Sequence, residues 1–379
     1  MVCGGGPSGL YFALLAKKHL ANIGTVTVFE QNPRDATFGF GIVLADRGLH
    51  RLRQADPESC EVITRSCFQS RNRIVTHRDE KIFIEGGGSG GAIARLRLLQ
   101  ILQRCCESAG VEVLYEHPLN AGNLPEADLI VGADGVNSVV RAAHADGFGA
   151  TSHTLTGKLA WYGTAAHFPY PILSFKQNEL GYFWCVAYAH TESMSTFVAE
   201  CDAKTWLRSG LHAMNEEEAR RFCEKLFASE LRGHHLLSNK SLWGSFPVTR
   251  VQRWHVGNKV LVGDALHSAH PSIGSGTRIA MEDSIALINA LKANRSLDDA
   301  LHAFQRDRCR GKQLLLVAAE KSINWYETVV PRLQRYEPLE LVFDYMARTG
   351  RLDEPRLMAE YPRFMRQYGA RWREFMAAR

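Results

Sequence analysis

The sequence predicts an α/β fold in which a mainly parallel sheet is combined with an inserted β-sheet domain and a helical C-terminal extension. Three observations favour this class. A glycine cluster, residues 4–9, precedes a long apolar run. Two short apolar runs, residues 129–133 and 259–262, each end beside an Asp-Gly or Gly-Asp pair. Residues 151–244 then change to aromatic and β-branched stretches of strand length.

The glycine cluster fits the phosphate-binding pattern G-x-G-x-x-G. Its residues are Gly4, Gly6, Pro7, Ser8 and Gly9. In this pattern the glycines allow a tight turn, close approach of a pyrophosphate, and close packing of a helix on a strand. The apolar residues that follow predict a helix whose N-terminus would face the phosphates.

A β-branched strand, residues 26–29, comes next and leads into Glu30. Glu30 lies 21 residues after Gly9, close to the roughly 20 expected for an acid that binds a ribose hydroxyl. We therefore expect Glu30 to bind a dinucleotide. The alternative is a chance glycine turn followed by an unrelated glutamate.

Acidic residues also follow the two later strands. Asp134 and Gly135 stand at the carboxyl end of the first, where ligands of parallel sheets bind. Asn137 is a candidate both for a further ligand contact and for the N-cap of the next helix, two roles that are compatible. Asp264 follows the second strand and would accept a hydrogen bond from a ribose or ribityl hydroxyl. The alternative for Asp264 is an ordinary turn.

A flexible loop, residues 271–276, precedes a long helical stretch, residues 277–291. Backbone amides at the start of such a helix stabilise negative charge on a ligand. We expect Gly274, Gly276 and Thr277 to contact an electron-rich cofactor ring there.

In this order, and over most of the chain, these motifs resemble the FAD-binding scaffold of the single-component (group A) flavoprotein aromatic hydroxylases. The resemblance implies a Rossmann-like FAD-binding domain of the glutathione-reductase type. It implies FAD as cofactor and NADH or NADPH as reductant, without a separate nicotinamide domain. It also implies that oxygen reaches an electron-rich aromatic ring from a flavin C4a-hydroperoxide.

The resemblance assigns further residues. Arg95 stands at the family's position for a cofactor contact, the alternative being a solvated arginine. His270 stands where many members have proline, and His270 and Pro271 are expected at the catalytic position. His270, whose ordinary pKa is near 6.5, is a candidate base for the proton of the ring's donor group. The alternative is a histidine that only holds the loop, and His267 is expected to be structural.

An aromatic-binding cavity is expected beside the inserted sheet. Trp161, Tyr162 and Phe183 are its candidate lining residues, although each is also a good core residue. Arg278, which stands where many members have asparagine, is a candidate to hold a carboxylate or a CoA phosphate. A helix-surface arginine is the alternative for Arg278.

Several segments, including residues 161–164 and 195–200, narrow the resemblance to one branch. That branch contains salicylyl-CoA 5-hydroxylases, 2-aminobenzoyl-CoA monooxygenase/reductase and the indole-ring hydroxylase of violacein biosynthesis. The substrate is therefore expected to be an aryl-CoA thioester such as salicylyl-CoA or 2-aminobenzoyl-CoA. One alternative is a tryptophan- or indole-derived intermediate. A different class is an FAD-dependent reductase without oxygen chemistry.

The expected domains are interleaved along the chain. Residues 1–75, 92–150 and 245–295 form the FAD-binding domain, residues 76–91 and 151–244 the β-sheet substrate domain, and residues 296–379 the helical extension. Residues 178–181 predict a hairpin turn between two strands. The glycine-rich residues 85–91 predict a flexible segment, either a lid over the site or a plain surface loop.

Composition restricts the class of protein. The 379 residues are 45% hydrophobic and 22% charged, with a net charge of +5, which is ordinary for a globular enzyme and does not suggest a nucleic-acid partner. Nine cysteines without a C-x-x-C pair indicate reduced thiols, a cytoplasmic location and no metal site. Neither a membrane span nor a signal peptide is expected, and the oligomeric state stays open. Because only three residues precede Gly4, we expect a few N-terminal residues to be missing.

Overall fold

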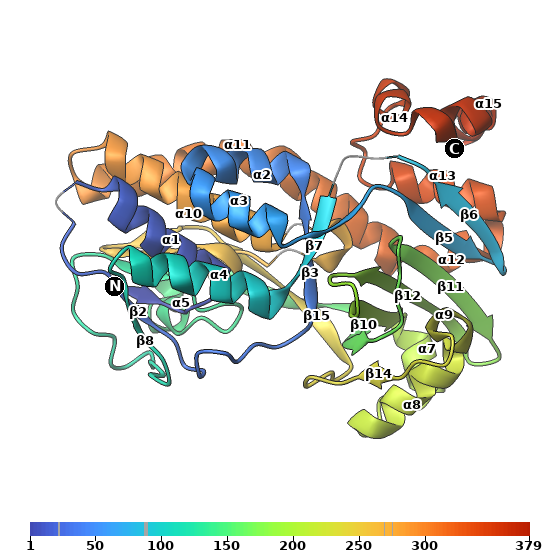
Figure 1. Ribbon diagram of the computed structural model, residues 1–379, viewed down its shortest axis with the longest axis horizontal. Helices are drawn as coiled ribbons and strands as arrows, with labels where there is room; N and C mark the ends of the chain where they lie inside the picture. Colours follow the sequence, from blue (N-terminus) through green and yellow to red (C-terminus); the bar gives the residue numbers. More distant parts are fainter. Residues whose placement is uncertain (22, 87–89, 269, 275) are drawn as a thin grey trace.

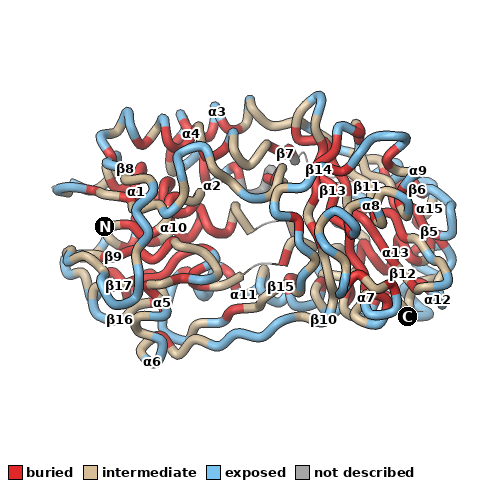
Figure 2. The backbone as a smooth tube through the Cα atoms, turned by 90° about the horizontal axis from the view of Figure 1, so that it is seen from below, coloured by how far each residue is buried: buried red, intermediate tan, exposed pale blue. Residues whose placement is uncertain are grey.

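The computed structural model describes residues 1–379 except residues 22, 87–89, 269 and 275 (Figure 1). Within these residues the strands form sheets of six, eight and three strands. The first two sheets organise two buried regions, which Figure 2 shows on either side of the centre. None of the helices described here is long and apolar enough to cross a membrane.

The six-stranded sheet has the order β16-β17-β9-β1-β2-β8 and is parallel except for β16. Its strands are β1 (Val2–Cys3), β2 (Thr27–Phe29), β8 (Glu112–Leu114), β9 (Ile130–Gly132), β16 (His255–Val256) and β17 (Lys259–Leu261). The strands predicted after the glycine cluster and before the two aspartates are thus confirmed. β2 and β9 flank β1, and β17 pairs with β9, all in parallel, so the carboxyl ends of these strands meet at one edge of the sheet.

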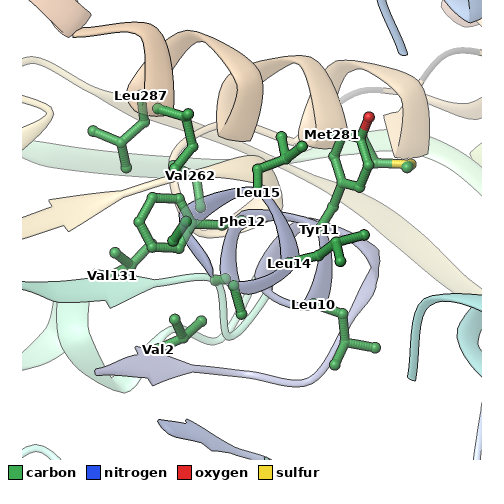
Figure 3. Close-up of a cluster of buried hydrophobic side chains, with 14 of the residues drawn as sticks. Val2, Leu10, Tyr11, Phe12, Leu14, Leu15, Val131, Val262, Met281 and Leu287 are labelled. Carbon is green, nitrogen blue, oxygen red and sulfur yellow. The ribbon is translucent and has the colours of Figure 1, made fainter. Parts of the chain in front are cut away.

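Helices cover this sheet and form the first buried region. They are α1 (Pro7–His19), α2 (Asp46–Ala55), α3 (Pro57–Arg65), α4 (Arg95–Ser108), α5 (Val139–Ala143), α6 (Ala145–Phe148), α10 (Gly276–Ala293) and the start of α11 (Leu297–Glu327). In Figure 3, α1 lies between the sheet and α10: Phe12 faces Val131 and Val262, and Tyr11 lies beside Met281. Residues 8–16 of α1 are all buried, which explains why this part of the helix is largely apolar on every side.

A three-stranded antiparallel sheet lies between the two larger sheets (Figure 1). It consists of β3 (Gly41–Ala45), β7 (Gly90–Ala94) and β4 (Phe68–Ser70). Gly90 and Gly91, predicted to be part of a flexible segment, belong to β7, while residues 87–89 of that segment lie outside the described residues.

The eight-stranded sheet has the order β14-β10-β13-β12-β11-β5-β6, and β15 also pairs with β10. Its strands are β5 (Arg73–His77), β6 (Glu80–Ile84), β10 (Ala150–Thr164), β11 (Ile172–Asn178), β12 (Gly181–Ala189), β13 (Ser195–Cys201), β14 (Leu236–Leu237) and β15 (Gly244–Val251). The predicted hairpin is confirmed, since Asn178 pairs with Gly181 at the end of β11 and β12.

The two faces of this sheet are covered by different helices. One face packs against α7 (Ala203–Arg208), α8 (Glu216–Leu226) and α9 (Ala228–Leu231). The other packs against the end of α11, α12 (Val329–Arg335), α13 (Pro338–Ala347), α14 (Glu354–Glu360) and α15 (Pro362–Ala378). The C-terminal helices therefore bury a substantial apolar core.

The predicted division into domains stays a prediction. Three of its boundaries fall inside strands of the eight-stranded sheet: β5 crosses the boundary at 75/76, β10 crosses that at 150/151, and β15 crosses that at 244/245. Helix α11 contributes to both large cores, because Phe304 packs beside the parallel sheet and Trp325 packs beside the eight-stranded one.

Candidate active site

The N-terminal glycine loop packs at distances that only glycine permits. Gly4 has φ +101°, and a Cβ there would lie 2.5 Å from the carbonyl oxygen of Ala133. A Cβ on Gly9 would lie 2.0 Å from the Gly4 oxygen. Gly6 differs, because a Cβ at this position would meet no atom within 4 Å. The loop is thus pressed against β9 while its Gly6 side stays open to a ligand.

Glu30 is tied to this loop. Its Oε2 accepts a hydrogen bond from the Gly5 amide at 2.7 Å, and its Oε1 accepts two from Asn32, from the backbone amide at 2.8 Å and from Nδ2 at 2.7 Å. A carboxylate has lone pairs for about four hydrogen bonds. Glu30 is therefore held in place with accepting capacity to spare, as a ribose-binding acid requires.

Asp134 begins the turn after β9, next to Gly135 with φ +78°. Its Oδ2 accepts from the Val139 amide at 2.6 Å, whereas its Oδ1 is buried without a partner among the described residues. The capping alternative for Asn137 is wrong: Ser138 caps α5, with its Oγ accepting from the Arg141 amide at 3.0 Å. Asn137 is exposed, and its side chain does not cap the helix.

Arg95 and Asp264 come together from distant parts of the chain. Arg95 is the first residue of α4, and Asp264 lies in a 3₁₀ turn, η1 (Gly263–Ala265). Asp264 is exposed, but the protein around it partly desolvates the carboxyl and raises its pKa, and the charge of Arg95 partly opposes this change. The Arg95 Nε is buried without a partner among the described residues. Both residues thus have polar atoms available to a ligand at the edge of the parallel sheet where the carboxyl ends of the strands meet.

A buried ionic network supports the Asp264 turn. Asp283 of α10 accepts from the Gly263 amide at 3.2 Å, from Arg308 Nε at 2.7 Å and from Lys312 Nζ at 3.1 Å. The ring of His267 lies between Asp283 and Lys312. His267 therefore has the structural position that we expected for it.

The loop before α10 forms a second 3₁₀ turn, η2 (Pro271–Ile273), closed by Gly274 with φ +56°. Gly276 and Thr277 begin α10. Pro271 is half-buried, and its carbonyl accepts from the Gly274 amide at 2.8 Å. The helix predicted after this loop is thus present, and the contact of its first amides with a cofactor stays a prediction.

His270 precedes this turn and is buried. Its ring contacts Phe246 and Tyr326, with centroid distances of 5.1 and 6.2 Å. Its Nδ1 accepts a hydrogen bond from the Ser272 amide at 3.2 Å. Because an amide can only donate, the neutral ring carries its proton on Nε2.

Burial lowers the pKa of His270 to about 4, so the ring is neutral at pH 7. With Nδ1 occupied and Nε2 protonated, His270 is arranged to donate a hydrogen bond. This geometry therefore does not support the predicted role of His270 as a general base. It supports a role as a hydrogen-bond donor.

The three predicted aromatic residues do not share one face of the eight-stranded sheet. Side chains alternate along a strand, and Tyr162 and Phe183 belong to the core beneath α8, where Phe183 contacts Phe222 at 5.6 Å. Trp161 lies on the opposite face, and its Nε1 is buried without a partner among the described residues. Of the three, the structure places Trp161 alone on the face with Trp184.

Arg278 lies within a charged cluster on α10. Its Nη1 donates to Glu282 at 2.6 Å, and Glu282 also contacts Arg51 and Arg308 at 3.2 and 3.1 Å. Its Nε is buried without a partner among the described residues. Arg278 is therefore held mainly by Glu282, and its buried Nε–H is left for a ligand.

Glu200 is a candidate residue that sequence reasoning missed. It lies in β13 at 8% exposure and accepts from Trp184 Nε1 at 2.9 Å. Burial raises the pKa of Glu200 to about 7, although the Trp184 hydrogen bond opposes this change. Glu200 lines a cavity of about 20 Å³ with His270 and Tyr326, which is room for about one water molecule. Glu200 is the one charged residue in the sequence of β13, and this was the available signal.

Comparison with known proteins gives the family. A family profile described as "FAD binding domain" matches residues 115–312, about half of the chain. A salicyloyl-CoA 5-hydroxylase from Streptomyces is 34% identical over 357 residues, covering 91% of this chain and 69% of that protein. This chain belongs to the FAD-binding monooxygenases of the group A flavin hydroxylase family.

A second relative agrees with this membership, and a solved structure agrees with the fold. The protodeoxyviolaceinate monooxygenase of Chromobacterium violaceum is 32% identical over 374 residues, covering 97% of this FAD-binding monooxygenase and 99% of that protein. The structure of 2-methyl-3-hydroxypyridine-5-carboxylic acid oxygenase matches with a TM-score of 0.69 at 21% identity. The match covers 89% of this chain and 96% of the oxygenase chain. That structural likeness concerns the fold, and the predicted α/β fold class is confirmed.

The geometry of this monooxygenase fits FAD. The open side of Gly6 admits a pyrophosphate, and Glu30 has accepting capacity for a ribose hydroxyl. The orphaned Arg95 Nε and Asp134 Oδ1 are polar atoms that a bound ligand would satisfy, since buried polar groups normally have partners. Gly4, Pro7, Ser8, Gly9, Gly135, Asp264, Gly274, Gly276 and Thr277 remain predicted cofactor-binding residues.

Proposed function

We propose that this FAD-dependent aromatic monooxygenase hydroxylates an electron-rich ring carried as an aryl thioester, such as salicylyl-CoA or 2-aminobenzoyl-CoA, with O₂ and NADH or NADPH. The observation that carries the proposal is the 34% identity to a salicyloyl-CoA 5-hydroxylase over 91% of the chain. A hydroxyl or amino group beside the thioester would supply the electron density that such a ring needs.

Bound FAD would supply the oxygen chemistry. Amides at the start of α10, at Gly276 and Thr277, would face the negative charge of the reduced cofactor. His270 would donate through Nε2 to an oxygen of the substrate. Its neutral state favours this role, because a charged imidazolium would be unstable in so buried a position.

Glu200 is our candidate for the proton acceptor. A general base works best when its pKa lies near the working pH, and burial brings the pKa of Glu200 to about 7. The cavity that Glu200 shares with His270 and Tyr326 has room for a water molecule that could carry the proton. Trp184, Tyr326 and Phe246 surround this cavity with aromatic surface that limits access of bulk water.

An indole-derived substrate is the second candidate. The protodeoxyviolaceinate monooxygenase matches this chain over nearly the whole length of both proteins. Trp161, whose indole lies on the same face as Trp184, would suit stacking of a flat bicyclic ring. This candidate needs no group that recognises CoA.

A steady-state assay separates the candidates. The FAD-loaded protein is mixed with NADH or NADPH and, in turn, with salicylyl-CoA, 2-aminobenzoyl-CoA, free salicylate and tryptophan. We expect strong stimulation of NAD(P)H oxidation and a hydroxylated product with an aryl-CoA, and little with free salicylate. Stimulation by tryptophan alone would favour the indole candidate, and stimulation by none of the four would reject the thioester proposal.

We further propose that the enzyme works in the cytoplasm. All nine of its cysteines are free thiols, and such a set is typical of proteins from reducing compartments.

A further inference from the structure

Ser272, in the η2 turn that precedes α10, is held from three sides. Its amide donates to His270 Nδ1 at 3.2 Å. Its hydroxyl accepts from the Ser322 hydroxyl of α11 at 2.9 Å, and its carbonyl oxygen accepts from Arg348 Nη2 at 3.0 Å. Two of these three contacts come from the C-terminal helices, far along the chain from the turn.

Arg348 lies at the C-terminal end of α13 and uses its whole guanidinium group. Its Nη1 donates to the Tyr345 carbonyl at 2.9 Å, and its Nε donates to the Ser322 hydroxyl at 3.2 Å. The guanidinium carbon lies 4.0 Å from the centre of the Tyr345 ring. The group therefore bridges α11, α13 and the η2 turn at once.

The helix that carries Arg348 is a rigid support. Most residues of α13 are buried. Asp344 of the same helix accepts from Trp325 Nε1 of α11 and, at 3.0 Å, from Arg332 Nε of α12. The position of the guanidinium is thus fixed by three helices packed on the eight-stranded sheet.

We propose that Arg348 is a positioning residue for the active site: it fixes the η2 turn through Ser272, and so sets where His270, Pro271 and the start of α10 stand relative to the flavin. This inference rests on the proposed function, since it concerns the same site. It makes the C-terminal helices part of the catalytic apparatus.

Lysine cannot replace arginine in this role. A guanidinium presents five donors in a planar fork, whereas an ammonium is a compact point charge. Lysine would keep the charge and lose the simultaneous bonds to Ser272, Ser322 and Tyr345. A displacement of about 1 Å at a reacting group can lower the rate about 100-fold, so loosening this turn should be visible in catalysis.

The test compares R348A, R348K and S322A with R366A, which removes an exposed arginine of α15. All variants are prepared as full-length, FAD-loaded protein. The readouts are the dissociation constant for FAD, the circular dichroism of the bound flavin between 350 and 500 nm, and the product formed per NAD(P)H oxidised. Thermal unfolding is measured in parallel.

We expect R348A to change the flavin dichroism, to lower the product formed per NAD(P)H, and to lower kcat by about 10- to 100-fold. R348K and S322A should change the same readouts in the same direction, but by a smaller amount than R348A. R366A should match the wild type. The proposal is overturned if R348A matches R366A in dichroism and coupling, whatever its melting temperature. If R348A does not fold, unchanged values in both R348K and S322A overturn it. If the wild type hydroxylates no tested compound, the proposed function fails while dichroism and FAD affinity still decide the role of Arg348.

Discussion

The indole of Trp184 donates a hydrogen bond to Glu200 Oε2 at 2.9 Å across the neighbouring strands β12 and β13. The pair is buried on the face of the sheet that the C-terminal helices cover. An indole N–H can only donate, and a carboxylate only accepts. The contact therefore stabilises the ionised form of Glu200 inside an apolar surrounding that otherwise favours the neutral form.

The activity should depend on ionisation of Glu200. Since the ionised form accepts the proton, kcat/KM should rise with pH through about 7, the pKa to which burial brings Glu200. Glu200→Gln should remove this rise and lower kcat/KM at pH 8 by about 100-fold or more. A pH series of NAD(P)H-coupled hydroxylation measures both effects.

Trp184→Phe gives a matched control for this series. It removes the donor without removing the carboxylate, so the pKa of Glu200 should increase and the rise in activity should move to higher pH. A rise that stays at the same pH in both Glu200→Gln and Trp184→Phe would show that another group titrates.

Stability should also depend on Glu200, with the opposite dependence on pH. A carboxyl group whose pKa is raised by folding stabilises the native state below its unfolded pKa, near 4.5, and this contribution is lost as pH rises through about 7. One pKa unit corresponds to about 1.4 kcal/mol, so the loss is about 3 kcal/mol. Urea unfolding at pH 5 and pH 8 should show the wild type weakening relative to Glu200→Gln. Parallel pH profiles of the two proteins would contradict this.

Gly6→Ala should weaken FAD binding with little effect on the fold. Gly6 has φ −74° and ψ 177°, which alanine adopts freely, and its Cβ would meet no protein atom within 4 Å. The methyl group would instead occupy space needed by the pyrophosphate. We expect the dissociation constant for FAD to increase about 10-fold or more, with the unfolding free energy of the apoprotein within about 1 kcal/mol of the wild type.

Gly24→Ala is the control for Gly6→Ala, because Gly24 is exposed and also has no atom within 4 Å of an added Cβ. It should leave FAD affinity unchanged. Equal FAD affinities in the two variants, measured by titration of the apoproteins, would place the pyrophosphate elsewhere.

Asp283→Ala should destabilise the protein strongly. Burial alone would raise the pKa of Asp283, but Lys312, His267 and Arg308 hold it below its ordinary value. Removal of the carboxylate would leave Lys312 buried without a balancing charge and would leave Arg308 paired with Glu282 alone. Breaking a buried pair in this way costs about 3–5 kcal/mol, which urea unfolding would detect. A loss below about 1 kcal/mol would mean that the two cations find other partners.

The parallel sheet and the cofactor loop were predictable because their signals are local. A short apolar run followed by Gly-Asp or Asp-Gly identifies a buried strand and the turn that ends it. The positions of Asp134 and Asp264 follow from such runs without any knowledge of distant contacts. The branch of the family was also predictable, because whole segments of the chain carry the resemblance.

The substrate side depends on contacts that the sequence does not state. Tyr162 and Trp161 are adjacent, and only the covering helices decide which of them faces the core beneath α8. Glu200 becomes buried because the eight-stranded sheet is covered by α11. Arg348 reaches Ser272 across 76 positions of the chain. None of these relationships follows from periodicity or from spacing between motifs.

The most direct test of the account uses ¹⁸O₂ with salicylyl-CoA and, separately, with free salicylate. We predict that one ¹⁸O atom enters the aromatic ring of salicylyl-CoA for each NAD(P)H productively oxidised, and that free salicylate gives little labelled product. Oxidation of NAD(P)H that leaves salicylyl-CoA unlabelled, or equal labelling of free salicylate, would contradict the claim that this monooxygenase recognises an aryl thioester.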